Sequence, residues 1–544
     1  MTDPHWSAVA RDLTVEMTRS ASVTNSDGER AFSGVLHAMI SREAYFAQHP
    51  EQVWLQAIAD DPQGRSNVWA WSRGSGREVV VLTGHYDVVS ASNYGPLEPY
   101  AFDPDALLPR LIADLRSSAR NDAERRALQD LESGDFLPGR GLLDMKAGLA
   151  AGLVALYRHA AHSERVGNVV FIAVADEEDR SVGARGAAPA LSAWAREHDL
   201  EIVGVINLDA TSDHGDGTDG RAVYHGSVGK LLVCAYCVGT DVHAGYALDG
   251  INANFLASEI TRRFEHNPVL ADRSMNEIGT PPTSLRQTDL KPQYDVTTPA
   301  RAWACFNMPI HGKTASDVMS DFQREAKIAL HNALEVLRDR AESLRRTDSA
   351  AHGAGAPLVL SYAELLEVAR SAGHANFDAD FDRVLRSVDA HADLPTQSVT
   401  IINWLWDRSG LLGPAVVLSF GALHYPSTIL SEHHPADARL MRVTRAVLEE
   451  ARGEVSVVER TYFMGISDMS WFGRGDAVQI GVVNANTPSL NARITAPPAH
   501  LPTINFGPWG RDYHQWLERA YAPYTFGQLP ELVWRIATRL LEEG

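Results

Sequence analysis

Short apolar runs alternate with longer amphipathic segments over the first 210 residues. Residues 77–89, 168–178 and 201–210 contain β-branched runs such as VVVL, VVFIAV and IVGVI, which favour strands. Residues 144–162 and 183–200 show the wider apolar spacing of helices. Strands that are apolar throughout and alternate with helices predict an α/β fold, with a mostly parallel sheet flanked by helices.

The pattern changes after the glycine- and aspartate-rich stretch TSDHGDGTDG, which is typical of a domain boundary. A strand, a helix, two strands and a long helix are then expected in order, at 230–240, 251–264, 284–290, 301–310 and Ser316 to Arg346. This order predicts a smaller α+β lid domain inserted into the larger one. We expect a larger domain formed by residues 1–213 and 431–544, and an inserted domain formed by residues 214–430. The inserted domain includes an extra helical segment after 347 and one strong strand at 414–423.

Composition and charge narrow the class of protein. The hydrophobic fraction of 45% and the charged fraction of 22% are those of a globular chain. The formal net charge of −20 repels phosphate backbones, so nucleic acid is not expected as a partner. No apolar run reaches the roughly 18 residues of a membrane span, and the N-terminus does not resemble a signal peptide. We expect no membrane association.

The three cysteines suggest a reducing compartment, which predicts a cytoplasmic protein. Cys234 and Cys237 form a CxxC pair that could indicate a redox or zinc site. They lie within the apolar run LLVCAYCVG, however, and no second CxxC accompanies them. We therefore expect buried structural cysteines.

Acids and histidines recur where the predicted strands end. They are His85 and Asp87 after the first strand, Asp144 in GRGLLDMKAG, the run Asp176–Asp179 with Glu177 and Glu178, and Asp209. Each has an ordinary structural explanation when taken alone: Asp144 could cap a helix, the acid run could be a solvated loop, and Asp209 could cap a turn. Because ligands bind at the carboxyl ends of strands in open α/β sheets, four such positions at one edge favour a functional site.

The residue types at this edge favour metal binding. In the HxD sequence, His85 and Asp87 point to the same side, so the carboxylate could hold the second imidazole nitrogen. Converging carboxylates repel one another unless cations neutralise them. Histidine and carboxylate ligands suit zinc or a similar divalent ion, and two metals sharing one carboxylate could activate a water molecule.

Other catalytic motifs are incomplete. GRGLLD lacks the third glycine of a dinucleotide-binding loop, and HGSVGK lacks the upstream glycine and final Ser or Thr of a P-loop. No GxSxG elbow follows a strand, and no cysteine stands at a strand end near a histidine. Nucleotide binding and covalent catalysis are therefore not expected.

The motifs GHYDVV, GRGLLDMKAG and ADEEDRSVGARG, in this order and spacing, resemble one metallopeptidase family. That family includes aminoacylase, carboxypeptidase G, acetylornithine deacetylase and succinyl-diaminopimelate desuccinylase. The resemblance covers about residues 70–260 and returns after about 455. Within the family, FMGISDMSWF and GRDYHQWLERAYAPYTF most resemble arginine-utilisation proteins of the RocB type. The resemblance implies a dinuclear metal-dependent hydrolase that cleaves the amide or peptide bond of a small N-acyl amino acid or peptide and acts in arginine utilisation.

The resemblance also assigns roles to residues. Two divalent metals, zinc with cobalt or manganese as alternatives, would be bound by His85, Asp144, Glu178, Asp209 and His514, with Asp144 as the bridge. Glu177 would be the general base, and Asp87 would orient His85. His514 is preferred to His424, His433, His434 and His500 because only His514 lies in the matching context GRDYHQWLERAYAP.

The lid segment GTDVHAGYALDGINAN resembles a family segment whose histidine reaches the substrate oxyanion, in many relatives from the partner subunit. This implies a catalytic role for His243 and a homodimer formed through the lid, although a surface-loop histidine is the alternative. GISDMSW similarly places Asp468 near the substrate. The family arginine two residues beyond Asn307 is replaced by Pro309. Either another basic residue, such as Arg286 or Arg301, binds a substrate carboxylate, or the substrate lacks that carboxylate. With Asp468, the residues Asn307, Arg286 and Arg301 are the expected substrate-binding residues.

We thus expect a hydrolase that uses metal-activated water, with Glu177 as the general base. One rival is a single-metal hydrolase. Another is a non-catalytic metal-binding or regulatory accessory protein, but a retained base has no use in a metal store. Two segments have no counterpart in ordinary members and could reshape the pocket: the loop at 88–140, with a helical stretch at 109–133, and the segment 347–430.

Overall fold

The structure is a computed structural model that describes residues 3–212, 220–354, 356–389, 392–473, 475–494 and 499–543. The chain divides into two units. Unit 1 comprises Met1–Ser227, Thr428–Gly475 and Pro498–Gly544, and unit 2 comprises Val228–Ser427 and Asp476–Pro497. Residues 476–497, which we expected in the larger domain, thus belong to unit 2. The boundary expected between residues 213 and 214 lies outside the described residues.

Unit 1 is built on an eight-stranded sheet. Its strands, in spatial order, are β1 (Val53–Ala57), β2 (Ser66–Ser72), β5 (Val166–Val174), β3 (Ser75–His85), β6 (Glu201–Asn207), β19 (Thr503–Asn505), β8 (Ala222–Tyr224) and β18 (Val458–Arg460). The central strands β5, β3, β6 and β19 are parallel, whereas β2 and β1 continue the sheet antiparallel. The strands predicted from the apolar runs are therefore present as β3, β5 and β6, and the expected α/β class is confirmed.

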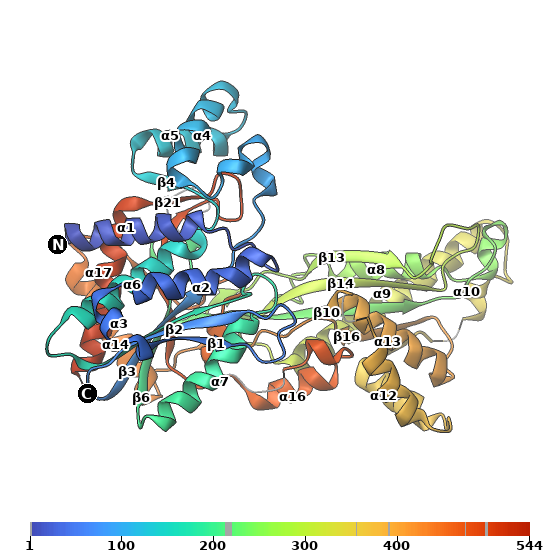
Figure 1. Cartoon of the computed structure of the whole chain (residues 1–544). Helices are drawn as coiled ribbons and strands as arrows, with labels where there is room; N and C mark the ends of the chain where they lie inside the picture. The colour runs from blue at the N-terminus through green and yellow to red at the C-terminus, as the bar shows by residue number, and fades with distance from the viewer. Residues whose placement is uncertain are drawn as a thin grey trace. The chain divides into compact units, whose positions relative to one another are not determined.

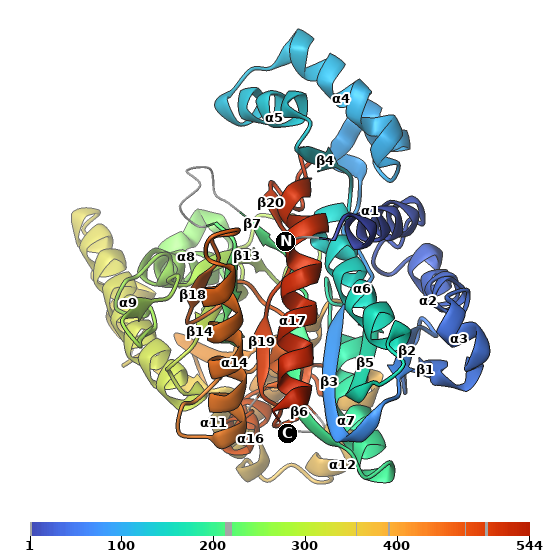
Figure 2. The same ribbon diagram turned by 90° about the vertical axis from the view of Figure 1, so that its left-hand side faces the viewer.

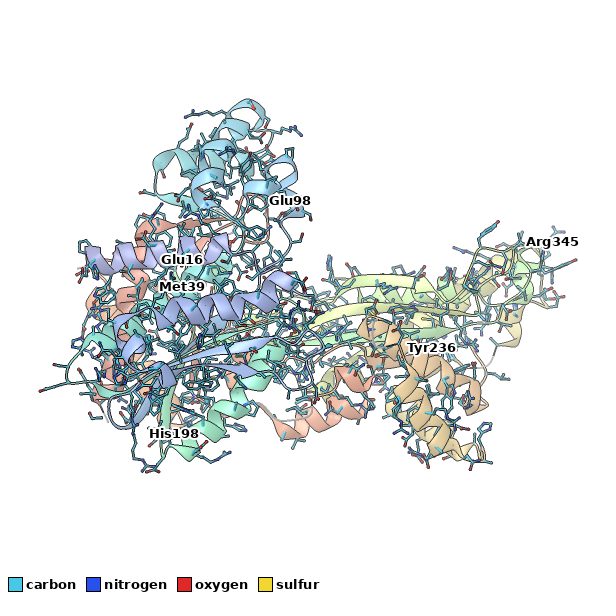
Figure 3. All side chains as sticks on the ribbon, in the orientation of Figure 1. Glu16, Met39, Glu98, His198, Tyr236 and Arg345 are labelled. Carbon is cyan, nitrogen blue, oxygen red and sulfur yellow. The ribbon has the colours of Figure 1, made fainter. Side chains whose placement is uncertain are left out.

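Helices cover both faces of this sheet (Figures 1 and 2). On one face, α6 (Ala147–Ala161) and α17 (Leu529–Glu542) pack on the strands and on each other, with α1 (Pro4–Arg19) against α6. Helix α2 (Asp27–Ser41) packs against β2, and its residue Met39 is buried (Figure 3). On the other face lies α7 (Val182–Glu197). No helix in the described part of the chain is long and apolar enough to cross a membrane.

The 88–140 segment leaves the main sheet and returns through a second, four-stranded sheet. It contains η2 (Ser92–Tyr100), α4 (Pro104–Ser118) and α5 (Asp122–Ser133). The second sheet has the order β4 (Phe136–Pro138), β21 (Arg519–Tyr521), β20 (Trp509–Arg511) and β7 (Thr211–Ser212). The single helical stretch expected at 109–133 is thus two helices, because the Asn121 side chain caps a new helix. This sheet joins the segment to the C-terminal part of the chain.

We predict that His159 on α6 makes the unfolding free energy of unit 1 fall at low pH. Its side chain is buried, with Nδ1 2.7 Å from Ser72 Oγ and Nε2 3.2 Å from the Val166 carbonyl. Burial lowers its pKa from the ordinary 6.5 to about 4, against the opposing effect of the Val166 carbonyl. As the pH falls, His159 is therefore protonated in the unfolded chain at a higher pH than in the folded chain. Stability from this residue is present above about pH 6.5 and is lost between there and about pH 4.

We expect a shift from about pH 7 to about pH 5 to lower the unfolding free energy of unit 1 by roughly 2 kcal/mol through His159. Urea unfolding of the wild type and of His159→Gln at both pH values measures this effect. The variant should lose less stability than the wild type, whereas His433→Gln, at an exposed position, should behave as the wild type does. Equal losses in all three proteins would contradict the assignment.

Unit 2 contains a five-stranded sheet covered on both faces. Its strands, in spatial order, are β13 (Thr283–Asp289), β14 (Arg301–Ile310), β10 (Gly229–Val238), β16 (Ala415–Phe420) and β15 (Leu358–Ser361). One face packs on α8 (Ala253–Phe264) and α9 (Ala315–Ser343), which correspond to the two helices expected there. The other face packs on α11 (Tyr362–Ser371), α12 (Phe377–Ser387) and α13 (Leu394–Ser409). The extra segment after residue 347 therefore supplies a second helical layer.

The central strand β10 faces both helical layers. Cys234 contributes to the cluster with α11 and α13, whereas Cys237 contributes to the cluster with α8 and α9. Residues three apart in a strand point to opposite faces, so the CxxC pair cannot form a site. Both cysteines are buried free thiols, as expected. Tyr236 (Figure 3) donates a hydrogen bond to Asn403 Oδ1 of α13 at 2.6 Å, which ties this strand to the extra layer.

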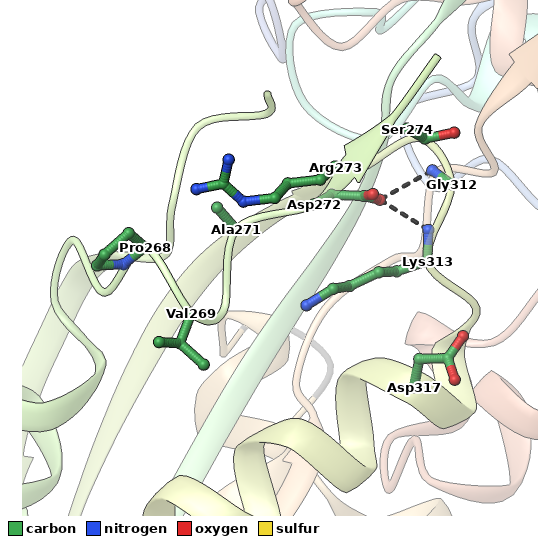
Figure 4. A pocket seen from close by; sticks show the side chains of 9 residues that line it. All are labelled: Pro268, Val269, Ala271, Asp272, Arg273, Ser274, Gly312, Lys313 and Asp317. Carbon is green, nitrogen blue, oxygen red and sulfur yellow. Dashed lines mark hydrogen bonds between the residues drawn. The ribbon is translucent and has the colours of Figure 1, made fainter. Parts of the chain in front are cut away.

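A buried aspartate fastens a small hairpin of unit 2 to the start of α9. Asp272 Oδ2 accepts hydrogen bonds from the backbone N–H groups of His311, Gly312 and Lys313 at 2.7–2.8 Å. The last two contacts are drawn in Figure 4. Asp272 directly precedes β11 (Arg273–Ser274), which pairs with β12 (Glu277–Ile278). An open pocket of about 620 Å³ lies here, but it contains none of the predicted site residues.

Candidate metal centre

Neighbouring parallel strands of unit 1 bring His85 and Asp209 together. His85 is the last residue of β3, and Asp209 follows the end of β6, so both lie at the carboxyl edge of the sheet. Asp144 completes the group from the turn before α6. His85 Nε2 lies 3.1 Å from Asp144 Oδ1 and 3.7 Å from Asp209 Oδ1. All three side chains are buried.

Asp144 also contacts a second group through its other oxygen. Its Oδ2 lies 3.1 Å from His514 Nε2, and the same nitrogen lies 3.0 Å from Glu178 Oε1. Asp144 stands in a non-helical stretch before α6 and makes no side-chain cap of that helix. The structural alternative for this residue, a helix N-cap, therefore does not apply. The two carboxylate oxygens face two different histidines, as a bridging metal ligand requires.

Three sets of nitrogen and oxygen atoms are close enough to share a metal ion. Within each set the atoms lie within 4.8 Å of one another. The sets are His85 with Asp144 and Asp209, Asp144 with Glu178 and His514, and His85 with Glu177 and Glu178. All five predicted ligands and the predicted base belong to them. Imidazole nitrogen with carboxylate oxygen is the donor set of zinc and related divalent ions, so these residues fit such a metal.

Asp87 contacts both His85 and the backbone of the Glu177–Glu178 turn. Its carboxylate oxygens accept hydrogen bonds from the backbone N–H groups of Glu177 at 3.0 Å and Glu178 at 3.2 Å. The His85 Nδ1 atom is closer to the Asp87 backbone carbonyl, at 2.9 Å, than to the carboxylate, at 3.6 Å. The carbonyl thus orients the imidazole and leaves Nε2 facing Asp144. The carboxylate positions the Glu177–Glu178 turn as well, and its expected role in orienting His85 stays a prediction.

The crowding of carboxylates makes the site electrostatically unfavourable without a cation. Burial raises the pKa of Glu177 well above its ordinary value, and the neighbouring Asp209, Asp468 and Glu178 raise it further against the effect of His85. Burial likewise raises the pKa values of Glu178 and Asp209. Divalent cations would relieve this repulsion.

The histidines respond in the opposite direction. Burial alone lowers the pKa of His514, but contacts with Asp144 and Glu178 outweigh it and raise the pKa to about 10. For Asp144, burial raises the pKa, but hydrogen bonds from His514 and His85 outweigh it and lower the pKa. A proton on His514 therefore neutralises charge that a metal would otherwise neutralise, so metal binding should release it.

Asp468 lies in the same buried neighbourhood. It directly precedes α15 (Met469–Phe472) and is 1% exposed. Burial raises its pKa to about 7, and its charge acts on Glu177. The structure thus places the predicted Asp468 beside the predicted base. Its contact with substrate stays a prediction.

The other predicted substrate residues belong to unit 2. His243 is exposed, and its Nδ1 accepts a hydrogen bond from the Gly245 N–H at 3.0 Å. Asn307 lies on β14. Arg286 pairs with Asp393 at 2.8 Å, and Arg301 lies 3.7 Å from Asp407. Both arginines therefore have carboxylate partners in or next to α13, and the roles of these four residues in substrate binding stay predictions.

Among the C-terminal histidines, only His514 belongs to a ligand set in the described residues. His424 is buried in unit 2, with Nδ1 3.1 Å from the Lys230 carbonyl. His434 lies 3.5 Å from Asp437. The sequence context that favoured His514 thus agrees with its position.

A buried arginine next to the acid run was not predicted from the sequence. Asp176 belongs to none of the ligand sets and pairs with the buried Arg65 at 2.5 Å, and Arg65 also contacts Glu29 and Asp61. Nothing in the sequence marks Arg65 as their partner.

Buried Glu518 supports the Asp144 turn. Its Oε1 accepts hydrogen bonds from the backbone N–H groups of Leu143 at 3.2 Å and Asp144 at 3.4 Å. Its Oε2 pairs with Arg140 at 2.5 Å. Arg140 and Glu518 stand inside the motifs GRGLLD and GRDYHQWLER, which is the only signal that could have found them.

Comparison with known proteins identifies the family. The sequence pattern of peptidase family M20/M25/M40 matches residues 123–503. The chain belongs to this family. Protein RocB of Bacillus subtilis (strain 168) is 30% identical, over 97% of this chain and 94% of its own. Succinyl-diaminopimelate desuccinylase of Bordetella avium (strain 197N) is 31% identical, over 34% of this chain and 42% of its own.

Solved structures agree with this fold. The structure of aminopeptidase PepT from Bacillus cereus ATCC 10987 matches with a TM-score of 0.52 at 14% identity, covering 98% of each chain. The expected resemblance to a metallopeptidase family is confirmed, and the chain is a hydrolase of the M20/M25/M40 type. Within this family, the ligand sets described above are its candidate metal centre.

Proposed function

We propose that the chain is a dinuclear metallohydrolase that cleaves the amide or peptide bond of a small N-acyl amino acid or peptide. The observation that supports this most directly is the shared carboxylate of Asp144. One of its oxygens lies 3.1 Å from His85 and the other 3.1 Å from His514. A carboxylate shared by two histidine-containing sets is the arrangement that a bridging metal ligand needs.

In this proposal, His85 and Asp209 would hold one metal ion, Glu178 and His514 would hold a second, and Asp144 would contribute to both sites. Zinc is the first candidate, with cobalt and manganese as alternatives, because the donors are imidazole and carboxylate. Such ions supply a nucleophile by lowering the pKa of water and polarise a carbonyl group. The protein's own contribution is to hold the five side chains in place and to move protons.

Glu177 is the proposed general base. It is half-buried, lies beside His85 and Glu178, and its backbone N–H donates to the Asp87 carboxylate. It would accept a proton from the attacking water and return it to the leaving nitrogen. Its raised pKa supports this role, because a base that returns its proton must bind that proton well.

The substrate class rests on the relatives. One relative is named a desuccinylase and another an aminopeptidase, which supports a carbon–nitrogen bond as the one that is cleaved. Similarity to protein RocB over nearly the whole chain, together with the resemblance to arginine-utilisation proteins, supports a role in arginine utilisation. Arginine derivatives are therefore the first substrates to test. The three free thiols support a cytoplasmic location.

Metal content per chain tests the site. We expect about two ions in the wild type and about one each in His85→Ala and His514→Ala, because each variant removes a ligand of a different set. His433→Ala is the matched control, since His433 is exposed and belongs to no ligand set. Elemental analysis after incubation with zinc, cobalt or manganese measures the content. No bound metal under any of these conditions would refute the proposal.

Activity assays with N-acyl amino acids and dipeptides then distinguish a metal-dependent hydrolase from a metal-binding protein without activity. Turnover that is lost in His85→Ala and His514→Ala supports the hydrolase. Two bound metals without turnover of any such compound would favour the alternative, a metal-binding accessory protein of the same fold.

A homodimer through unit 2 is the second part of the proposal. β13 is the outermost strand of the sheet, and its backbone edge can pair with another chain. Leu285 on this strand is 63% exposed, and Tyr294 beyond it is 91% exposed. Light scattering should give about twice the chain mass of 59.4 kDa, and Leu285→Lys should shift it toward one chain. A single-chain mass for the wild type at tens of micromolar would contradict a dimer.

A further inference from the structure

The loop that presents His514 has an unfavourable backbone conformation. It connects β20 to β21 and contains two residues other than glycine with positive φ, Asp512 at 56° and His514 at 63°. A residue with a side chain adopts this region at a cost of about 1 kcal/mol or more, so surrounding contacts must hold it there. The contacts that do so come largely from the 88–140 segment.

The first contacts are made at the His514 backbone itself. Its carbonyl oxygen accepts hydrogen bonds from Asn93 Nδ2 at 2.9 Å and from Arg140 Nη2 at 3.2 Å. Arg140 Nη2 also donates to Asn93 Oδ1 at 2.9 Å, so the two side chains hold each other as well. Asn93 lies in η2 near the start of the segment, and Arg140 lies at its end. Residues from both ends of the 88–140 segment therefore donate hydrogen bonds to the His514 backbone.

The second contacts are made at the flanks of the loop. Asp130 on α5 accepts hydrogen bonds from Arg511 Nη1 at 2.8 Å, and from Arg519 Nε at 2.9 Å and Nη2 at 2.6 Å. Arg519 also donates to Asp512 Oδ2 at 2.6 Å. Arg511 ends β20 and Arg519 begins β21, so one carboxylate ties both sides of the loop. Paired contacts of this kind fix geometry as well as distance.

Arg140 also connects these contacts to Asp144, the proposed bridging ligand. The buried Arg140 pairs with Glu518, and Glu518 accepts hydrogen bonds from the backbone of Leu143 and Asp144. Asp144 and His514 are thus positioned relative to each other through Arg140. No comparable contact from this segment reaches His85 or Asp209 in the described residues. The contacts of Asn93 and Asp130 with the His514 loop therefore bear on one ligand set, that of Asp144, Glu178 and His514.

We infer that the 88–140 segment is a clamp: it holds the His514 loop so that Asp144, Glu178 and His514 can bind a metal ion. Asn93 and Asp130 are its positioning residues. This inference rests on the two-metal function proposed above. Neither residue belongs to a ligand set. Without them the His514 loop can relax from its left-handed conformation, and the imidazole no longer stays 3.1 Å from Asp144. Loss of a residue that orients a metal ligand typically lowers metal affinity by about 10- to 100-fold.

Zinc titrations against a chromophoric chelator test this inference in Asn93→Ala and Asp130→Asn. We expect one of the two zinc affinities to fall by about 10- to 100-fold and the other to be unchanged. Arg116→Gln is the matched control. It breaks a 2.7 Å pair between Arg116 on α4 and Glu132 on α5, in the same helical hairpin but without contact to the His514 loop. Both affinities of this control should equal those of the wild type.

Thermal unfolding of the metal-free proteins is measured in parallel. A clamp acting on the ligand leaves the metal-free midpoint of Asn93→Ala close to that of the control. Loss of both affinities together with a lowered midpoint would show a general structural role and overturn the inference. Unchanged affinities in both variants would overturn it while leaving the two-metal function intact, whereas a wild type without zinc would overturn both. If Asp130→Asn does not fold, Asn93→Ala decides alone.

Discussion

Replacement of Glu177 by Gln is expected to lower kcat for amide hydrolysis by about 100- to 10,000-fold while two metal ions stay bound. The variant keeps the size of the side chain but removes the group that accepts and returns the proton. Its position between His85 and Glu178, on the turn held by Asp87, is set by backbone contacts that the substitution leaves in place. Steady-state kinetics and elemental analysis of the same preparation measure both quantities.

Asp179→Asn is the matched control for this experiment. Asp179 belongs to the same acid run, but its carboxylate accepts a hydrogen bond from Asn25 at 3.0 Å and it is in no ligand set. This variant should retain both metal content and activity. If Glu177→Gln loses metal together with activity, Glu177 is a ligand and the assignment of the base is wrong.

Replacement of Asp144 by Asn is expected to remove both metal ions and all activity. Asp144 is the only residue whose two oxygens face both histidines in the described structure, so its charge serves both ligand sets. A neutral amide of the same shape offers one weak oxygen donor and one nitrogen that cannot bind a cation. The loss should therefore exceed that of His514→Ala, which leaves the set of His85 and Asp209 complete.

Zinc binding measured by calorimetry and metal analysis would distinguish these cases. Asp144→Asn with no metal and His514→Ala with about one ion per chain is the expected pair of results. One ion retained in Asp144→Asn would show that this carboxylate serves a single metal. The site would then be better described as mononuclear with a neighbouring acid cluster.

The sequence was informative where local pattern decides structure. The apolar runs that became β3, β5 and β6 are buried on both faces over most of their length, and such burial demands apolar residues almost without interruption. Because parallel strands share a carboxyl edge, His85, Glu178 and Asp209 could be expected in one place. His514 could be chosen among the C-terminal histidines only by its motif context.

Neighbouring acids in one motif show where local pattern fails. Asp176, Glu177 and Glu178 are chemically alike, yet Asp176 pairs with Arg65 whereas the other two join ligand sets. The difference arises from the positive φ of Asp176, at 67°, and from a partner more than a hundred positions away. Asp144 similarly satisfies the pattern of a helix cap but lies in a non-helical turn held by Glu518.

The strands at the candidate metal centre were therefore determined by the sequence itself, because burial and alternation are local properties. The residue types and the family were readable from motifs that are also local. The tertiary structure alone decided which atoms face one another. Arg140 and Glu518 are 378 positions apart, and Asn93 and His514 are 421 positions apart. Such contacts depend on how the whole chain closes on itself, and no local pattern of polar and apolar residues encodes them.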